Sequence, residues 1–447
     1  MKVSNYNFFF ANEYEDDKYI AYNSLSNSLA LIDSEKYKQY LDFEKNGVQI
    51  NDKKLVEDLK KGSFILNDGV DELLIIRHNM YAAKFDKSSF GLTIAPTSDC
   101  NFRCTYCYER DAINNCYMNE ETENNIVKML KNRAAYISNF NVMWYGGEPL
   151  LAVNILKRLS EKFIKICNDN NIAYNAGIIT NGYNLTKKNW EILKECKVDF
   201  IQITIDGDEK THNERRIYKN GKATFNKIIS NLINLKDEII PVSLRINVDK
   251  TNFSKTEEVL KIISYNGLTD VVRPYLAKVE NYNNCCDESN CLSVNEFESL
   301  NMAFMELMEV NGYKVEGTKK YRYPTRKNVI CTCDKFESYT INADGEVYKC
   351  WNDIGKGKYS INNINDSDNV KFNQIYLDYI MFDPTVNEKC SKCKYIAICM
   401  GGCPNKRINS PEQVCEEIMY KFEDRLKSLT YKLMMEKNIS KESIAFK

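Results

Sequence analysis

The sequence predicts an α/β protein built on a partial (β/α)6 barrel, with a small winged-helix-like domain before it and a cysteine-rich domain after it. Two observations carry this prediction. Between residues 90 and 278, six short apolar segments alternate with five helical patterns, which indicates parallel βαβ units. Most of the 17 cysteines follow the last of these segments. With 447 residues, the chain is long enough for two or three domains.

The composition excludes several classes of protein. Lys and Arg number 61 against 62 Asp and Glu, so charge gives no reason to expect nucleic acid or an anionic membrane as partner. No apolar run is long enough to span a membrane, and the N-terminus has no signal-peptide core, so we expect a soluble cytoplasmic protein. Two histidines argue against His-based zinc catalysis and Ser-His-Asp hydrolysis. Abundant thiols in a reducing compartment indicate iron–sulfur clusters or an all-cysteine zinc site.

Residues 1–88 contain no cysteine and read as one domain. The pattern predicts a β-hairpin from 19–22 and 28–32, helices around 37–43, 55–59 and 73–81, and a short strand at 64–66. This order of strands and small helices is winged-helix-like. A DNA-binding role is the plain reading of such a fold, but the segment has no concentrated basic face.

Residues 89–280 form the predicted barrel. Strands are expected at 91–95, 141–145, 176–180, 200–205, 242–248 and 270–276, and helices at 120–136, 151–167, around 190–193, 225–235 and 256–263. Spacing alone leaves a flat, doubly wound sheet as the alternative. Either fold places chemistry at the carboxyl ends of the strands. Residues 281–330 read as a bridging region, and 331–447 as a cysteine-rich domain that closes with a helix from 412 to about 437.

The first motif follows the first barrel strand. Cys100, Cys104 and Cys107 are spaced as CxxxCxxC on one loop. Three thiolates can bind three irons of a [4Fe–4S] cluster and leave the fourth iron open. Structural zinc suits this spacing poorly, because it needs four ligands that usually come in CxxC pairs.

This loop, with the aromatic Tyr106 before its last cysteine, resembles the radical S-adenosylmethionine (SAM) enzymes. The resemblance implies that a reduced cluster and SAM generate a 5′-deoxyadenosyl radical. It also implies roles for residues at the ends of the strands. Tyr106 and Ala277 would lie by the adenine, Gly146, Gly147 and Glu148 would hold the methionine amino group, and the remaining matches to SAM-binding positions are Asn181, Thr204, Asp206 and Arg216.

The C-terminal cysteines form a second pattern, which resembles the seven-cysteine SPASM domain. Its members are Cys333, Cys350, Cys390, Cys393, Cys399, Cys403 and Cys415. The resemblance implies two auxiliary [4Fe–4S] clusters, and therefore three in all. The outer cluster would use Cys390, Cys393, Cys399 and Cys415, and the inner one Cys333, Cys350 and Cys403 with Cys331. The close spacing of Cys331 and Cys333 leaves open whether one or both bind, and a four-cysteine zinc site is the alternative.

Two further features bear on chemistry. In the related anaerobic sulfatase maturases an aspartate directly follows the inner-cluster GxxxxC, whereas Trp351 stands here and Asp353 comes two residues later. Asp353 is therefore a candidate catalytic residue, and Trp351 counts against sulfatase maturation. Cys285, Cys286 and Cys291 cluster in a polar loop, either as surface thiols or facing the substrate.

Together with these motifs, the N-terminal domain resembles the RiPP recognition element of peptide-modifying enzymes. This implies a Cys-containing precursor peptide whose leader binds the N-terminal domain, and an electron donor such as flavodoxin or ferredoxin. The expected activity is formation of Cys-derived thioether crosslinks of the sactipeptide or ranthipeptide kind. The alternatives are an SPASM enzyme that oxidises or carbon-crosslinks a peptide or protein, and a non-catalytic iron–sulfur or zinc protein. The sequence does not determine the precursor, the carbon attacked or the oligomeric state.

Overall fold

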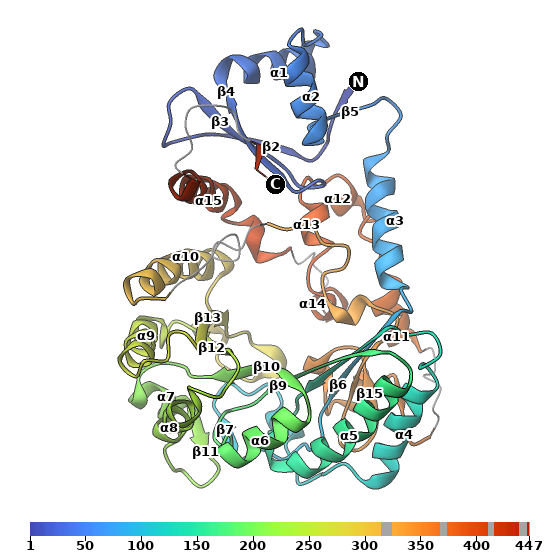
Figure 1. Cartoon of the computed structure of the whole chain (residues 1–447), viewed down its shortest axis with the longest axis vertical. Helices are drawn as coiled ribbons and strands as arrows, with labels where there is room; N and C mark the ends of the chain where they lie inside the picture. The colour runs from blue at the N-terminus through green and yellow to red at the C-terminus, as the bar shows by residue number, and fades with distance from the viewer. Residues whose placement is uncertain (314–323, 367–372, 410–414, 438–444, 447) are drawn as a thin grey trace. The chain divides into compact units, whose positions relative to one another are not determined.

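The computed structural model describes residues 1–313, 324–366, 373–409, 415–437 and 445–446. The chain divides into two compact units, which are coloured by residue number in Figure 1. Unit 1 contains Met1–Lys84, Val315–Cys331 and Phe382–Lys447, and unit 2 contains Phe85–Lys314 and Thr332–Met381. The C-terminal third of the chain therefore contributes to both units. Among the described residues, no helix is both long and apolar enough to cross a membrane.

Unit 2 is built on a nine-stranded sheet. Its parallel strands are β6 (Ser89–Ile94), β8 (Asn139–Trp144), β9 (Ala173–Ile179), β10 (Val198–Thr204), β12 (Val242–Val248) and β13 (Val272–Lys278). Each strand pairs with the next one along the chain, so the order never reverses. A doubly wound sheet reverses its order at a switch point. The six predicted strands and the partial barrel are thus confirmed, and the doubly wound alternative is wrong.

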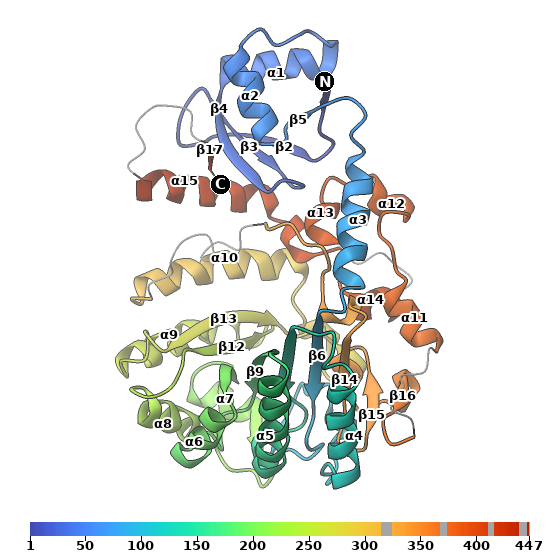
Figure 2. The same ribbon diagram turned by 45° about the vertical axis from the view of Figure 1, so that its right-hand side comes forward.

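Three short strands extend the sheet beyond β6 and were missed in the sequence. β14 (Ser338–Ile341) pairs parallel to β6, and β15 (Glu346–Tyr348) and β16 (Asn362–Asn363) follow it antiparallel (Figure 2). They come from the segment read as a separate cysteine-rich domain. Strands of two to four residues leave too little alternation to be recognised.

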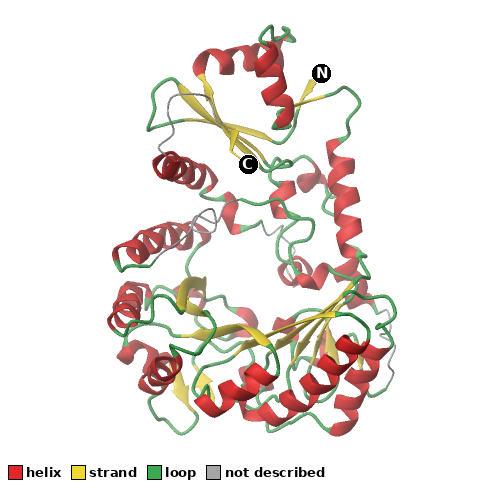
Figure 3. Cartoon of the chain, in the orientation of Figure 1, coloured by secondary structure: helices red, strands yellow, loops and turns green. Residues whose placement is uncertain are grey.

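Helices connect the strands of unit 2 (Figure 3). They are α4 (Glu120–Lys131), α5 (Val153–Asp169), α6 (Lys187–Glu195), α7 (Glu209–Arg215), α8 (Phe225–Leu235), α9 (Thr256–Tyr265), α10 (Val294–Val310) and α11 (Gln374–Ile380). Polar residues start several of them. The Asn119 side chain accepts a hydrogen bond from the Thr122 amide, and Ser293 with Glu296 forms a capping box at α10. The core between strands and helices includes the buried Phe140, Trp144 and Phe163.

Unit 1 contains a small antiparallel sheet with helices on both faces. The sheet order is β17 (Ala445–Phe446), β4 (Ser28–Asp33), β3 (Lys18–Asn23) and β2 (Asn7–Ala11), and β1 (Lys2–Val3) pairs separately with β5 (Ile65–Leu66). The N-terminal helices are α1 (Ser34–Asn46), α2 (Lys53–Lys61) and α3 (Glu72–Lys84). The predicted hairpin and three helices are present, and β2 is an additional strand.

The C-terminal segment of unit 1 packs on this sheet. Its helices are α12 (Glu388–Ser391), α13 (Ile396–Cys399), α14 (Pro404–Asn409) and α15 (Phe422–Lys437). Phe422 of α15 and Ile398 of α13 share one buried cluster with Phe8 and Tyr22 of the sheet. The expected start of the last helix, residue 412, lies outside the described residues, and the helix that the structure describes begins at Phe422. The chain also continues past it into β17.

Candidate active site

The three cysteines of the CxxxCxxC motif lie on the loop after β6. The short strand β7 (Phe102–Cys104) pairs antiparallel with β11 (Arg216–Tyr218), which places Cys104 opposite Arg216. Burial raises the pKa of Cys107 to about 12, with Cys104 adding to the rise. The pKa of Cys100 is also raised, by burial first and then by nearby charges that include the other two thiols. Each of these shifts includes a contribution from another thiol of the loop, and a metal bound there would deprotonate the thiols.

A tight glycine turn after β8 packs directly against this loop. A Cβ on Gly147 would stand 2.3 Å from the backbone oxygen of Asp99, the residue before Cys100. A Cβ on Gly146, where φ is +99°, would stand 2.5 Å from the Ala95 Cβ. Only glycine allows the two backbones to approach so closely. The turn therefore sets the position of the cysteine loop.

Glu148 follows the glycines and is buried. Its carboxylate accepts hydrogen bonds from the Thr180 hydroxyl at 2.6 Å, the Asn181 amide at 2.8 Å and the Leu150 amide at 3.1 Å. Burial raises the pKa of Glu148, and these hydrogen bonds oppose the rise. The Asn181 side chain in turn donates to the Asn101 side chain at 2.7 Å. The predicted Glu148 and Asn181 are thus joined to the cysteine loop through Asn101.

Tyr106, Asp206 and Arg216 form a second network. The Tyr106 hydroxyl donates to the Asp206 carboxylate and accepts from Arg216 Nη1 at 2.8 Å. It also accepts from the Asn247 side-chain amide at 3.1 Å. The fully buried Asp206 accepts from the Asn247 backbone amide at 3.1 Å. Three residues predicted from separate motifs therefore meet at one hydroxyl.

The sequence reasoning missed three members of this network. The Arg215 guanidinium stacks over the Tyr106 ring at 4.9 Å, with Nη1 2.7 Å from Asp249 and Nε 3.6 Å from Asp206. Asn247 and Asp249 lie at the carboxyl end of β12, a position that itself favours function in a barrel. The sequence therefore contained a signal for Asn247 and Asp249. The choice between Arg215 and its neighbour Arg216 needed the structure.

His212 contacts the backbone of Asp206. It lies on α7 and is fully buried. Its Nδ1 accepts from the Asp206 amide at 3.4 Å, and its Nε2 lies 3.1 Å from the Thr224 hydroxyl. Burial lowers the pKa of His212 well below its usual value, and the two adjacent arginines lower it further. Both ring nitrogens of this neutral imidazole have hydrogen-bond partners. The side chain therefore positions the loop that carries Asp206 and is not placed to act as a base.

Thr204 and Ala277 complete the predicted positions. Thr204 is buried at the end of β10, and Ala277 lies on β13 beside Asn247 of β12 in the parallel register. Both therefore stand at the edge of the sheet where the Tyr106 network lies. Their contacts with a cofactor stay a prediction.

The residues at this edge fit SAM bound to a three-cysteine cluster. Within the described part of the chain, the buried Nε of Arg216 has no hydrogen-bond partner. Buried donors are normally satisfied, so a carboxylate or sulfur acceptor is expected beside it. Cys104 is the largest of the charges that raise the pKa of Arg216, although burial opposes the rise. The arginine is thus placed between a cluster thiol and the Tyr106 hydroxyl.

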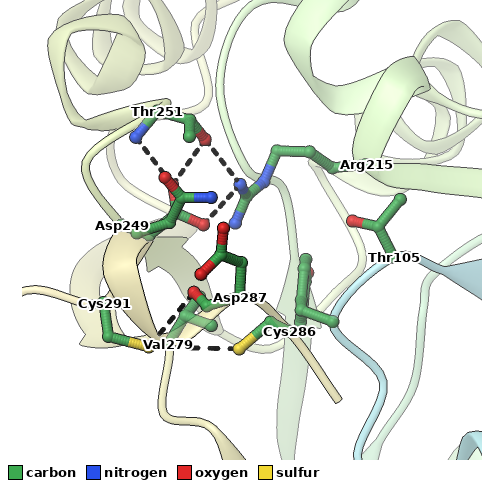
Figure 4. Close-up of a pocket in the computed structure, with 10 residues that line it drawn as sticks. Thr105, Arg215, Asp249, Thr251, Val279, Cys286, Asp287 and Cys291 are labelled. Atoms are coloured by element: carbon green, nitrogen blue, oxygen red, sulfur yellow. Dashed lines mark hydrogen bonds and ion pairs between the residues drawn. The ribbon is translucent and has the colours of Figure 1, made fainter. Parts of the chain in front are cut away.

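A cavity of about 260 Å³ lies next to this network (Figure 4). Its lining residues come from the cysteine loop, from the end of α7, from the ends of β12 and β13 and from the loop after β13: Thr105, Tyr106, Arg215, Asp249, Thr251, Val279, Cys286, Asp287, Asn290 and Cys291. The Sγ atoms of Cys286 and Cys291 are 4.0 Å apart, and Cys285 Sγ is 4.0 Å from Cys286 Sγ. Two of the three thiols whose role the sequence left open therefore line a cavity shared with Tyr106.

A further group of charged residues connects the cysteine loop to the segment after Cys350. Glu109 is buried, and burial raises its pKa to about 7 although Lys356 acts to lower it. Asp353 is also buried and accepts from the Tyr379 hydroxyl at 2.8 Å. Glu109 had no motif to mark it. Its burial is a property of the fold.

Trp351, the residue that stands in place of the maturase aspartate, is 39% exposed. Its ring stacks on Tyr145, with centroids 5.8 Å apart and planes at 23°. The pKa of Tyr145 is raised by burial and, more weakly, by Cys107 and Cys350. The stacked pair thus lies within electrostatic reach of a cysteine from each motif.

The four cysteines assigned to the outer auxiliary cluster all belong to unit 1. Burial raises the pKa of Cys390 to about 11, and Cys399, Cys393 and Cys415 raise it further. Cys393 likewise raises the pKa of Cys415. Their role as ligands stays a prediction.

The cysteines assigned to the inner cluster are divided between the two units. Cys333 and Cys350 belong to unit 2. There the pKa of Tyr379 is raised mainly by burial, and both cysteines raise it further. Cys331 and Cys403 belong to unit 1. Over the described residues, no three Cys, His, Asp or Glu side chains are arranged to hold a single metal ion.

Comparison with known proteins identifies the barrel. The Radical SAM superfamily matches residues 94–263, which span β6 to α9 and include the three loop cysteines. The chain is a radical SAM enzyme. Its C-terminal cysteines make it an SPASM enzyme related to the anaerobic sulfatase-maturating enzymes and to the peptide maturases.

Three similar proteins illustrate the relationship. The Cys-type anaerobic sulfatase-maturating enzyme of Clostridium novyi (strain NT) is 25% identical and covers 77% of this chain and 97% of its own. The radical SAM cyclopropyl synthase TigE of Paramaledivibacter caminithermalis is 22% identical and covers 97% and 91%. The crystal structure of Streptococcus suis SuiB bound to precursor peptide SuiA matches with a TM-score of 0.56 at 15% identity, over 92% of this chain and 97% of SuiB.

Proposed function

We propose that this radical SAM enzyme is a maturase that forms Cys-derived thioether crosslinks in a ribosomally made precursor peptide. The observation that carries the proposal is the N-terminal sheet of unit 1 on the same chain as the barrel and the SPASM cysteines. The sulfatase-maturating relative covers 77% of the chain, whereas SuiB, solved with its precursor peptide, matches 92% of it. The additional part of the chain that matches SuiB favours a precursor peptide as the substrate.

The SAM site supports radical chemistry. Cys100, Cys104 and Cys107 would hold the [4Fe–4S] cluster, and the bound pair of cluster and SAM supplies a 5′-deoxyadenosyl radical that removes a hydrogen atom from the substrate. The chain's own groups orient the cofactor. The glycine turn and Glu148 hold the cysteine loop, and Arg216 offers a free Nε beside Cys104. The interlocked bonds at Tyr106 fix this arrangement before the cofactor binds.

Thioether formation balances as an oxidation. The substrate loses one hydrogen atom from carbon and one proton from its cysteine thiol, the carbon–sulfur bond forms, and one electron is released. We propose that the SPASM cysteines hold two auxiliary clusters able to accept that electron, with flavodoxin or ferredoxin as the external electron donor. Fully loaded protein would then contain three [4Fe–4S] clusters, or about 12 iron atoms per chain.

We propose that the N-terminal domain binds the leader of the precursor. Its small sheet presents an edge strand, and extended peptides bind such edges through main-chain hydrogen bonds. The domain assignments made from the sequence are kept as part of this proposal, with residues 1–88 as the recognition element.

A second candidate function is oxidation of a cysteine in a protein substrate. The match over 97% of the sulfatase-maturating enzyme favours it. Trp351 argues against it, because by family resemblance an aspartate stands there in sulfatase maturases. The nearby Asp353 is held by Tyr379.

Mass spectrometry of the product separates the two candidates. A Cys-containing peptide encoded beside this gene is incubated anaerobically with reconstituted enzyme, SAM and reductant. A thioether removes two hydrogen atoms per crosslink and protects the cysteine from alkylation, whereas oxidation to an aldehyde removes the sulfur. A Cys→Ala peptide is the control. Loss of sulfur, or no change in a peptide that the enzyme binds, would contradict the thioether proposal.

A further inference from the structure

The loop after β13 contains three cysteines that the radical SAM chemistry leaves without a role. Cys286 Sγ lies 4.0 Å from Cys291 Sγ and 4.0 Å from Cys285 Sγ, and all three are free thiols. Cys285 is buried, whereas Cys286 and Cys291 are partly exposed and line the cavity drawn in Figure 4. Two accessible thiols in contact are the starting point for a disulfide.

Chain geometry selects Cys286 and Cys291 as the pair. Cys285 and Cys286 are adjacent, and neighbouring Cα atoms are about 3.8 Å apart, which is below the range of about 4.4–6.8 Å that disulfides normally span. Cys291 is five residues after Cys286. A single helical turn over Glu288–Asn290 separates them, and the Cys291 amide donates to the Glu288 carbonyl at 3.0 Å. This turn folds the chain back and brings the two thiols together.

The same turn is bonded to the segment that follows β12. The Lys250 backbone amide donates to the Asn290 carbonyl at 3.0 Å, and the Lys250 ammonium donates to the preceding carbonyl at 3.1 Å. Lys250 directly follows Asp249, whose carboxylate is 2.7 Å from Arg215 Nη1. The Arg215 guanidinium in turn stacks over the Tyr106 ring. A displacement of the turn is therefore transmitted to the Tyr106 network.

The pair is protonated at neutral pH. Burial raises the pKa of Cys291 to about 11, with Cys286 adding to the rise, and burial also raises the pKa of Cys286. Only the thiolate attacks a disulfide, so the oxidation of this pair is slow. Its extent is therefore measured at equilibrium.

We propose that Cys286 and Cys291 form a reversible disulfide that weakens the binding of SAM beside the Tyr106 network. The oxidant is a low-molecular-weight disulfide, RSSR. One cysteine displaces an RSH molecule and forms a mixed disulfide, and the other cysteine then displaces the second RSH. The S–S bond of RSSR breaks and that of the protein forms. The two cysteine sulfurs lose two electrons and two protons in total, which leave with the two RSH molecules.

The expected weakening follows from the movement that the bond requires. The sulfur atoms must approach by about 2 Å to reach an S–S length of about 2.05 Å, so the turn that carries Cys291 moves with them. Its hydrogen bonds to Lys250 pull on Asp249, and the Arg215 guanidinium loses the geometry that holds it over Tyr106. The inference depends on SAM binding at this network and is independent of the peptide substrate.

Mass spectrometry detects the disulfide directly. Reconstituted enzyme is equilibrated anaerobically with mixtures of reduced and oxidised glutathione, and its free thiols are then alkylated. Trypsin releases the three cysteines in one peptide, residues 279–314. The expected product has one alkyl group, on Cys285, and a disulfide between Cys286 and Cys291, which fragmentation locates. Three alkylated cysteines in every mixture, or a glutathione adduct without an internal disulfide, would overturn the proposal.

The affinity for SAM is the second measurement. Calorimetry should show that the oxidised enzyme binds SAM at least about fivefold more weakly than the reduced enzyme, and a thiol reductant should restore the affinity. Because the coupling is reciprocal, saturating SAM should lower the equilibrium constant for disulfide formation by the same factor. A disulfide that leaves the SAM affinity unchanged, or raises it, would contradict the proposal.

Two variants separate the disulfide from oxidative damage to the clusters. Cys291→Ser should bind SAM with the same affinity before and after treatment with oxidised glutathione, with iron content measured in every sample. Cys285→Ser is the matched control, because it changes the neighbouring thiol and keeps both sulfurs of the pair. It should retain the disulfide and its effect on SAM binding. An equal loss of affinity in Cys291→Ser would show that the pair is not responsible.

Discussion

In the large sheet of unit 2, functional side chains gather at the carboxyl ends of parallel strands, whereas the small sheet of unit 1 carries apolar side chains on both of its faces. In the first arrangement, the polar side chains form hydrogen bonds with one another. The Tyr106 hydroxyl alone has three hydrogen-bond partners, in Asp206, Arg216 and Asn247. In the second, α15 covers one face and α1 and α2 cover the other. The side chains at the barrel edge are thus held in place by polar contacts with one another, whereas the small sheet is held by the apolar packing of helices against its two faces.

The two regions also differ in how they can be tested. The barrel site tolerates point changes with clear readouts. Removal of residues 1–88, the obvious test of leader binding, would strip Phe8 and Tyr22 from the core they share with Ile398 and Phe422. Loss of activity in such a deletion would report misfolding of the C-terminal segment as much as loss of the leader. Point changes are therefore the sharper tools for unit 1.

The largest effect is expected from the loop cysteines. Changing Cys100, Cys104 and Cys107 together to Ala should reduce 5′-deoxyadenosine formation to background, because the open iron that binds SAM is lost. Iron content should fall from about 12 to about eight atoms per chain as the SPASM clusters remain. Chromatography and iron analysis measure the two outcomes. Cys167→Ala, a buried thiol on α5, is the control and should retain SAM cleavage. Residual cleavage in the triple variant, or zinc as the native metal, would contradict the assignment.

The shared core of unit 1 should give the next largest effect. Phe422 is buried against Phe8 at 4.7 Å and Tyr395 at 5.0 Å between ring centroids. Phe422→Ala should lower the free energy of unfolding of unit 1 by about 3–5 kcal/mol through loss of contacts and creation of a cavity. Hydrogen exchange of the β3 amides measures this change. The exposed Phe253→Ala should alter stability by no more than about 0.5 kcal/mol. Equal effects of the two changes would disprove a common core.

A steric change at the glycine turn should damage the barrel site without changing a cysteine of the loop. Gly147→Ala forces a Cβ to within 2.3 Å of the Asp99 oxygen, so the loop that carries Cys100 must move. We expect SAM cleavage to slow by about five- to 150-fold, which corresponds to roughly 1–3 kcal/mol of overpacking strain. Gly91→Ala is matched, because its Cβ would meet Ser338 at an ordinary 3.4 Å. Comparable rates for both variants would show that the close approach does not matter.

The smallest expected effect concerns a single hydroxyl. Tyr106→Phe removes the hydroxyl that joins Asp206, Arg216 and Asn247, so each of these residues loses one hydrogen bond. The dissociation constant for SAM should rise about tenfold, which corresponds to about 1.4 kcal/mol. Calorimetry under anaerobic conditions measures the affinity. In the control Tyr275→Phe, a hydroxyl bonded to Gln202 on the same sheet is lost, and SAM affinity should not change. An unchanged SAM affinity in Tyr106→Phe would show that the network is not part of the SAM site.

Much of the barrel site could be predicted because its residues follow the strands in short, recognisable motifs. Cys100, Glu148 and Asp206 each come directly after a strand, so the alternating pattern alone places them at one edge of a parallel sheet. Glu109 could not be found this way, since nothing near it in the chain shows that it is buried. Arg215 is adjacent to the predicted Arg216, and only the fold shows that both guanidinium groups serve the network.

In unit 1, the sequence predicted the hairpin and the helices but not their partners. Alternation along β3 and β4 reveals two apolar faces, and it does not reveal that α15 covers one of them. The same limit applies to β14, which is four residues long and adds to β6 in the barrel sheet from a distant part of the chain.

The sequence by itself determined the order of the six barrel strands and their helices along the chain, and the cysteine spacings, because each of these depends on residues close together in the chain. The strand order within the sheet decided for the partial barrel and against a doubly wound sheet. Tertiary structure decided which distant segments meet: β11 beside β7, β14 beside β6, and the C-terminal strand beside β4. The physical reason is that pairing across long separations depends on which strand edges and apolar faces are still uncovered once the local elements have formed. No local pattern of side chains records that outcome.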